Sequence, residues 1–315
     1  MKPIFRVALV GLLAGLGVIA VAEESWAVFA GGSRLMFYYT QRSLVNSGAG
    51  PGSAGTIIGI TNQNGGTAVD VRINIFNGST CANFGPVQFT IGARGTLRIN
   101  IADQVAAASF PEGWVDVRAV NAGGSPIQWD QLSGKGTILD FGGSNTSVAT
   151  YEAGALFSDD ANRATSGAQG ALIANNGDGN TFGALAGSVE FWAPGGPFNT
   201  NHRLVVIPVS TIPGTAPIAS NYPFVWTRVS DELGTRNAPV AFACMLASSL
   251  ADLHPGFAAS YPNGASLTDG GNISISNDGT NKGFVGALFE TAPNPSLLVV
   301  HSIQQSVGPT MESHE

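Results

Sequence analysis

Apolar and polar residues alternate along much of the chain, and the clearest case is residues 55–81, GTIIGITNQNGGTAVDVRINIFNGSTC. Val69, Val71, Ile73 and Ile75 occupy one phase of this alternation, and polar residues occupy most of the other. A period of two residues is typical of a β-strand with one buried face. We therefore predict a strand whose four apolar side chains lie in the core.

A second strand is predicted just before it, over residues 56–61. The residues between the two strands, Asn62–Thr67, read NQNGGT. Asn and Gly tolerate the positive φ angles of tight turns. We expect this segment to be a hairpin connection, so that the two strands pair with each other.

The same alternation predicts further strands in the first half of the chain, at residues 88–91, 96–101, 114–120, 127–129 and 136–141. Their inward positions are expected to include Leu97, Ile99, Ile101, Val115 and Val117. The charged residues of the opposite phase are expected on an exposed face, as pairs that aid solubility and register: Asp70, Arg72, Arg98, Asp116 and Arg118.

Strands are also predicted in the second half, at residues 188–192, 203–209, 224–229, 239–244, 272–276, 284–289 and 296–303. Residues 241–253 could instead form a helix, and we prefer a strand to Cys244 followed by one helical turn before Pro255.

Short strands at regular spacing indicate an all-β protein built from two antiparallel β-sandwich halves packed together. The expected boundaries are residues 31–157 and 186–307 for the two halves, a polar, Gly/Asn-rich connecting segment at 158–185, and a polar tail at 308–315.

One stretch supports a more specific expectation. The unit GITNQNGGTAVDVRINIF, with Ile60, Asn62, Gly65, Val69 and Val71, resembles the opening of immunoglobulin-like β-sandwich modules of secreted bacterial proteins. The resemblance covers about 25 residues and implies a fold, but no site residue.

The N-terminus has the pattern of a secretory signal peptide. Lys2 and Arg6 precede an apolar run that closes on Ala22, with Glu23 directly after it. We expect residues 1–22 to be removed on export, with Ala27 and Ala30 as other possible cleavage sites. An uncleaved membrane anchor is the alternative, but the run is shorter than the span of about 20 residues that a membrane helix needs.

The amino-acid composition limits the classes of molecule that the protein is expected to bind. The chain has a formal net charge of −7, and only 11% of its residues are charged, against about 25% in ordinary soluble domains. An acidic chain repels phosphate groups, which argues against nucleic acid as a partner.

The two cysteines, Cys81 and Cys244, are expected to bond to each other in an oxidising compartment, with two separate buried thiols as the alternative.

The sequence contains no strong catalytic signature. It has no Gly-x-Ser-x-Gly nucleophile motif and no His-Glu-x-x-His metal motif. The loop at residues 174–180 offers Asn176, Asp178 and Asn180 as oxygen ligands for calcium. It lacks the spaced carboxylates and terminal Glu of a calcium-binding loop, so a simple turn is the preferred interpretation.

Glu190 and Trp192 form the most suggestive pair for ligand binding, because they share one phase of a predicted strand. An indole beside a carboxylate can stack on a sugar ring and accept its hydroxyl protons. A tryptophan packed between the halves is the competing interpretation.

These features favour an exported structural or adhesive protein of the bacterial envelope or extracellular matrix, without an active site or cofactor. Its expected partners are other envelope or matrix proteins or further copies of itself. The alternative is a secreted carbohydrate-binding or carbohydrate-active protein that uses Glu190 and Trp192.

Overall fold

The computed structural model describes residues 32–156 continuously. Beyond them it describes residues 164–168, 188–193, 201–209, 220–228, 236–242, 244–249, 271–276, 283–293, 296–302 and 304–305. The predicted signal peptide, the loop at 174–180 and the polar tail lie outside the described residues.

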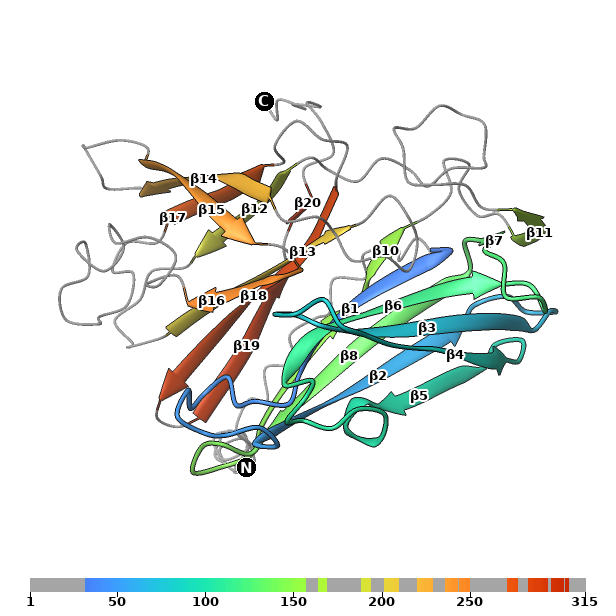
Figure 1. Cartoon of the computed structure of the whole chain (residues 1–315), viewed down its shortest axis with the longest axis horizontal. Helices are drawn as coiled ribbons and strands as arrows, with labels where there is room; N and C mark the ends of the chain where they lie inside the picture. The colour runs from blue at the N-terminus through green and yellow to red at the C-terminus, as the bar shows by residue number, and fades with distance from the viewer. Residues whose placement is uncertain are drawn as a thin grey trace, which may run out of the picture.

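Two antiparallel sheets contain all the strands of the first half, residues 32–156, except β7, which pairs with β11 (Ala164–Ala168) in a two-stranded sheet. A five-stranded sheet has the order β10-β1-β6-β3-β4, and a four-stranded sheet has the order β5-β2-β8-β9 (Figure 1). The strands are β1 (Arg34–Thr40), β2 (Ala54–Asn62), β3 (Val69–Asn77), β4 (Asn83–Ile91), β5 (Thr96–Asn100), β6 (Glu112–Val120), β7 (Ile127–Trp129), β8 (Leu132–Asp140), β9 (Ser147–Glu152) and β10 (Gly154–Leu156). A short 3-10 helix, η1 (Ile101–Asp103), follows β5.

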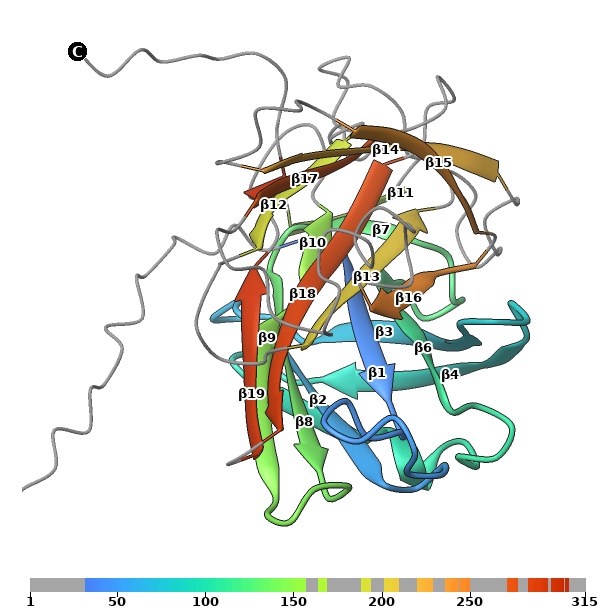
Figure 2. The ribbon, with the colours of Figure 1, turned by 90° about the vertical axis from the view of Figure 1, so that its left-hand side faces the viewer.

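The second half, residues 188–305, contributes two more antiparallel sheets, with the orders β15-β14-β17-β12-β20 and β16-β13-β18-β19. Its strands are β12 (Ser188–Ala193), β13 (Asn201–Val209), β14 (Ser220–Arg228), β15 (Arg236–Phe242), β16 (Leu246–Ser249), β17 (Gly271–Ser276), β18 (Gly283–Pro293), β19 (Ser296–Ser302) and β20 (Gln304–Gln305). Figures 1 and 2 show the sheet of β13, β16 and β18 between β1 and the sheet of β14, β15 and β17.

The all-β prediction is confirmed, as is the phase of the main strands. Val71, Val115 and Val117 are fully buried, and Val69, Ile73 and Ile75 are nearly so. Of the other inward positions, Ile99 and Ile101 are buried and Leu97 is half-buried. Alternation therefore identified the core face of β3, β5 and β6 correctly.

The predicted hairpin at Asn62–Thr67 is wrong, although both strands exist. β2 pairs with β5 and β8, whereas β3 pairs with β4 and β6. Because both edges of each strand are occupied by other strands, β2 and β3 cannot pair with each other. The turn instead carries the chain from one sheet to the other.

The buried side chain of Asn62 anchors this turn. Its buried side-chain amide donates a hydrogen bond to the Thr67 carbonyl at 2.8 Å, and its Oδ1 accepts one from Trp129 Nε1 at 3.2 Å. The same oxygen accepts from the Asn64 backbone N–H at 3.1 Å. A buried polar group is stable only when it is bonded in this way, so Asn62 holds the turn against the core.

Strand β1 was not predicted from the alternation. Its sequence, RLMFYYT, is buried at every position, so its buried faces give no period of two. β1 pairs with β6 and β10. Five other short strands, β9, β10, β11, β16 and β20, were also missed, and β16 occupies part of the segment where a helical turn was expected.

The predicted connecting segment, residues 158–185, contains one described strand. This strand, β11 (Ala164–Ala168), pairs with β7 of the first half. The remainder of the segment lies outside the described residues.

The expected exposure of Asp116 and Arg118 is also wrong. Asp116 is 1% exposed and Arg118 is 6% exposed. Strands beyond residue 200 pack against the same face of β1 and β6, where the ring of Phe289 lies 5.3 Å from that of Tyr38. At Tyr38, the face that alternation alone would assign to solvent is therefore covered by the second half. Arg98 is exposed as predicted, while Asp70 and Arg72 are half-buried.

Asp116 lies between two guanidinium groups. Arg34 Nε donates to Asp116 Oδ1 at 2.8 Å, and Arg118 Nη2 donates to the other carboxylate oxygen. Burial opposes ionisation of Asp116, but the charges of Arg34 and Arg118 more than offset this and hold its pKa well below the ordinary 3.8. The carboxylate therefore stays charged in the folded protein and neutralises part of the buried positive charge.

One hydrophobic core joins the two halves. Its cluster contains residues from both sheets of the first half and also residues of the second half. The second-half members are Val205, Ile207, Cys244, Met245, Val285, Ala287 and Phe289. The halves are therefore packed together through apolar contacts, and not only tethered by the chain.

We expect Val71→Asp to lower the free energy of unfolding by more than about 3 kcal/mol, because it places an unpaired charge in the core. The neighbouring change Arg72→Ala is the control. It removes a half-buried side chain whose Nη1 donates to the Gly124 carbonyl at 3.4 Å and should cost about 1 kcal/mol or less. Urea denaturation measures both, and equal losses would contradict the observed phase of β3.

Acid should destabilise the protein through Asp116. Because its folded-state pKa is depressed, its contribution is fully present above the unfolded value near 3.8 and is lost as the pH falls towards the folded-state pKa. We expect Asp116→Asn to cost about 3–5 kcal/mol at neutral pH, since Arg34 and Arg118 lose their counter-charge. It should also flatten the fall in stability below about pH 4. Denaturation midpoints at several pH values test this, and an unchanged acid slope would contradict it.

Candidate functional site at the joint between the two halves

A turn between β3 and β4 begins the joint, and Asn77 shapes it. The Asn77 Oδ1 accepts hydrogen bonds from the backbone N–H groups of Ser79 at 2.8 Å and Thr80 at 2.9 Å. Its Nδ2 donates to the Ser109 carbonyl at 2.7 Å. Asn commonly stabilises a turn in this way, by accepting hydrogen bonds from the backbone N–H groups that follow it. It presents Cys81, which has a φ of 57°, towards the second half.

Cys81 and Cys244 form a disulfide with a Cα–Cα distance of 5.3 Å, which confirms the predicted pairing. Cys244 follows β15 and is 2% exposed. Since the two cysteines are 163 residues apart in sequence, the bond links the first half covalently to the second. No free cysteine remains in the chain.

An ion pair links the halves at a second point. Arg203 Nη2, from β13, donates to both carboxylate oxygens of Glu112 on β6, at 2.7 and 2.9 Å. The Tyr38 hydroxyl donates to the same carboxylate at 3.2 Å. The Arg203 side chain is 30% exposed and that of Glu112 is 17% exposed, so water only partly screens the pair.

The surroundings of this ion pair favour its charged form. Burial disfavours the charge on Arg203, but Tyr38 and Glu112 more than offset burial and raise its pKa above the ordinary value. Burial, followed by the negative charge of Glu112, raises the pKa of Tyr38 well above 10, so Tyr38 is a neutral hydrogen-bond donor. Arg203 therefore stays charged and Tyr38 stays protonated near neutral pH, which keeps both as hydrogen-bond donors.

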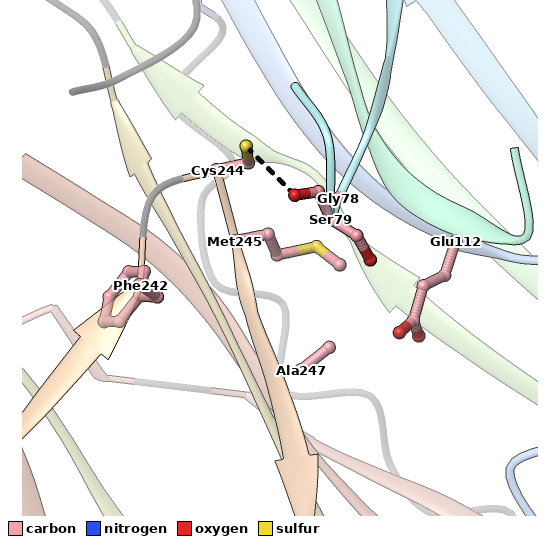
Figure 3. A pocket seen from close by; sticks show the side chains of 7 residues that line it. All are labelled: Gly78, Ser79, Glu112, Phe242, Cys244, Met245 and Ala247. Atoms are coloured by element: carbon pink, nitrogen blue, oxygen red, sulfur yellow. Dashed lines mark hydrogen bonds between the residues drawn. The ribbon is translucent and has the colours of Figure 1, made fainter. Parts of the chain in front are cut away.

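A partly open cavity of about 240 Å³ lies beside these two links (Figure 3). Its described lining residues are Gly78, Ser79, Glu112, Phe242, Cys244, Met245 and Ala247. Met245 extends from the second half towards Ser79, and the Ser79 carbonyl oxygen lies 3.8 Å from Cys244 Sγ. A glycine at position 78 leaves room here, because a Cβ atom would come within 2.5 Å of Met245 Cε.

The cavity has little capacity for catalysis. Glu112, the one carboxylate in the described lining, is already held by Arg203 and Tyr38. Its volume is also below the range of about 300–1,000 Å³ typical of ligand sites. We interpret it as a packing gap at a cross-linked joint.

No group of three or more His, Cys, Asp or Glu side chains that could hold a metal ion occurs within the described residues. The same part of the chain contains no helix long and apolar enough to cross a membrane.

A larger hollow lies on the outer face of the sheet β5-β2-β8-β9. It measures about 500 Å³, and its lining includes Gly59 and the polar or charged residues Thr61, Thr96, Arg98, Lys135 and Thr137. Arg98 and Lys135 are both exposed. We call this hollow the outer groove.

The residues predicted for ligand binding are placed only in part. Glu190 and Trp192 lie on β12, opposite Ser274 and Asn272 of β17. Their side chains lie outside the described part of the structure, as do Asn176, Asp178 and Asn180 entirely. The sugar-binding and calcium predictions therefore remain predictions.

Sequence reasoning missed the partnership of Glu112 with Arg203 and the outer groove. No local pattern links Glu112 to a residue 91 positions later. One feature of the sequence could have indicated the groove: Gly59 lies in the middle of an alternating strand. A glycine inside a strand often marks a bulge or a site where a ligand or another backbone approaches closely.

Compared with known proteins, the chain matches no protein-family model, no curated protein and no solved structure.

We expect the double change Cys81→Ser with Cys244→Ser to destabilise the protein strongly. Closing a loop of 163 residues contributes up to about 5 kcal/mol in the chain-entropy description. Ser79→Ala, which alters the cavity wall but not the bond, should cost little. Thermal unfolding compares the variants, and peptide mapping without reductant should recover the two cysteines in one linked fragment. Recovery of two alkylated thiols would refute the link.

Proposed function

We propose that this protein is exported and serves as a structural or adhesive component of the bacterial envelope or extracellular matrix. The observation that carries the proposal is the Cys81–Cys244 disulfide, which joins the two halves. Disulfides of this kind persist in oxidising compartments and are rare in the reducing cytosol. The apolar run before Ala22 supplies an export signal that agrees with this setting.

We further propose that each half is an antiparallel β-sandwich of the immunoglobulin-like type. In the first half, this is supported by the contribution of both sheets to one core, with Ile58 and Ile60 from β2, Val71 from β3 and Val117 from β6. The second half likewise contains one five-stranded and one four-stranded antiparallel sheet.

A cross-linked joint suits a load-bearing or surface-presented protein. The disulfide, the Glu112–Arg203 ion pair and the shared core act at the same boundary. All three must break before the halves separate. The two halves therefore resist local opening more than two domains joined only by a flexible linker would. A low proportion of charged residues, 11%, leaves a surface suited to packing against neighbouring molecules.

Export is tested by expressing the full chain in a bacterial host and fractionating the culture. We expect the protein outside the cytoplasm, beginning near Glu23 and fully disulfide-bonded. Leu13→Arg should block export because a charge interrupts the apolar run, whereas Ser25→Ala, just beyond the expected cleavage site, should not. A cytoplasmic protein that retains residues 1–22 and reduced cysteines would overturn the proposal, and sizing of the exported protein reports its assembly.

A further inference from the structure

The outer groove lies on a row of residues that crosses all four strands of its sheet. Gly59 on β2 is opposite Arg98 on β5 and also opposite Lys135 on β8, and Lys135 is opposite Glu152 on β9. Because neighbouring strands lie about 4.8 Å apart, the backbones of Arg98 and Lys135 are separated by about 10 Å, with Gly59 between them. The row thus places a cation on each side of a position without a side chain.

Hydroxyl groups flank this row on both sides. Thr61 is opposite Thr96 and Ser133, and the Thr61 and Thr96 hydroxyls are hydrogen-bonded at 2.9 Å. On the other side of the row, Thr137 is opposite Ile57. A ligand in the groove would therefore meet hydroxyl, guanidinium, ammonium and carboxylate groups on one face of the sheet.

Arg98 has unused binding capacity. Its side chain is exposed and makes no hydrogen bond or ion pair in the described part of the protein. A guanidinium carries five N–H donors in a planar arrangement that matches a carboxylate or sulfate group. In a chain with a net charge of −7, the groove combines Arg98 and Lys135 with one carboxylate, that of Glu152. Its local excess of positive charge attracts anions.

The floor of the groove is open because residue 59 is glycine. A Cβ atom built there would have only the Lys135 carbonyl oxygen near it, at 3.7 Å, which is an ordinary contact. Packing within the sheet therefore does not require glycine at this position. Since glycine weakens a strand interior, access to the groove floor gives a reason for its presence.

From these observations we propose that the outer groove binds an anionic polysaccharide, with an acidic group of the sugar between Arg98 and Lys135 and sugar hydroxyls on Thr61, Thr96 and Glu152. The groove volume of about 500 Å³ lies within the range of about 300–1,000 Å³ found for ligand sites. The proposal deepens the adhesive role proposed above, on which it rests for its biological setting.

An acidic peptide fits the groove less well. β2 and β8 are central strands with partners on both edges, so a peptide could not add to the sheet by main-chain pairing. Ile57 is the one apolar side chain among the groove residues that the structure describes, whereas peptide recognition depends on buried apolar anchors. Recognition by charge and hydroxyl groups favours a sugar chain.

Calorimetric titration of the purified, secreted full-length protein tests the proposal. The probes are polygalacturonate and dextran sulfate as anionic glycans, dextran as a neutral glycan, and polyglutamate as an acidic peptide. We expect binding of at least one anionic glycan, weakened by salt, and no binding of dextran. Absence of binding to both anionic glycans, or equal affinity for polyglutamate, would overturn the proposal.

Four variants locate the site. Arg98→Ala removes a charge-assisted contact and should weaken binding about tenfold. Gly59→Val should weaken it at least as much by filling the groove floor. The controls are Arg42→Ala, which removes an exposed charge outside the groove, and Gly55→Val, which adds the same side chain to β2 where nothing lies within 4 Å. Both controls should bind like the unaltered protein, and thermal unfolding confirms that all four fold.

Trp192→Ala separates this groove from the pair predicted on β12. Loss of glycan binding in Trp192→Ala, with Arg98→Ala unaffected, would assign recognition to β12 and overturn the proposal. The experiments distinguish failure of one proposal from failure of the other. A cytoplasmic protein that binds polygalacturonate through Arg98 would overturn only the proposal of export. An exported protein that binds no anionic glycan would overturn only the proposal of glycan binding in the outer groove.

Discussion

Strand β6 carries Glu112, Asp116 and Arg118 on one face, and that face is covered by protein. An ion removed from water costs several kcal/mol unless a partner of opposite charge and further hydrogen bonds replace the water. Asp116 meets this requirement inside the first half, through Arg34 and Arg118. Glu112 meets it only through Arg203 of the second half and the hydroxyl of Tyr38. The first half therefore depends on the second to cover and neutralise this face.

This dependence explains how the joint is built. Apolar side chains such as Phe289 and Met245 cover the face, while Arg203 neutralises Glu112 at its margin. The disulfide then lies close to the ion pair, because Gly78 and Glu112 are joined by a backbone hydrogen bond of 2.8 Å and Cys81 follows in the same turn. Covalent, ionic and apolar contacts act on one boundary, so its opening requires the loss of all of them.

The opposite side of the first half has different physical properties. The outer face of β5-β2-β8-β9 remains accessible and polar, with Arg98, Lys135 and Glu152 exposed. The charged face of β6 and the outer groove thus belong to different sheets, although β9, at the edge of the groove's sheet, also contacts β19 of the second half.

Several features followed from local sequence alone. Alternation identified the buried positions of β3 and β6, because a strand with one buried face has a period of two whatever its partners are. The pairing of Cys81 with Cys244 followed from their number and from the expected compartment. These inferences needed no knowledge of which strands lie side by side.

Other features depended on contacts between distant parts of the chain. Whether the Asn62–Thr67 turn forms a hairpin or crosses between sheets was decided by β5, β8, β4 and β6, which occupy the edges of both strands. Asp116 and Arg118 have the spacing of exposed residues, yet both are buried in the folded protein. Arg98 has the same local pattern and stays exposed. A period of two separates the two faces of a strand, but only the tertiary structure determines whether the second face meets water or protein.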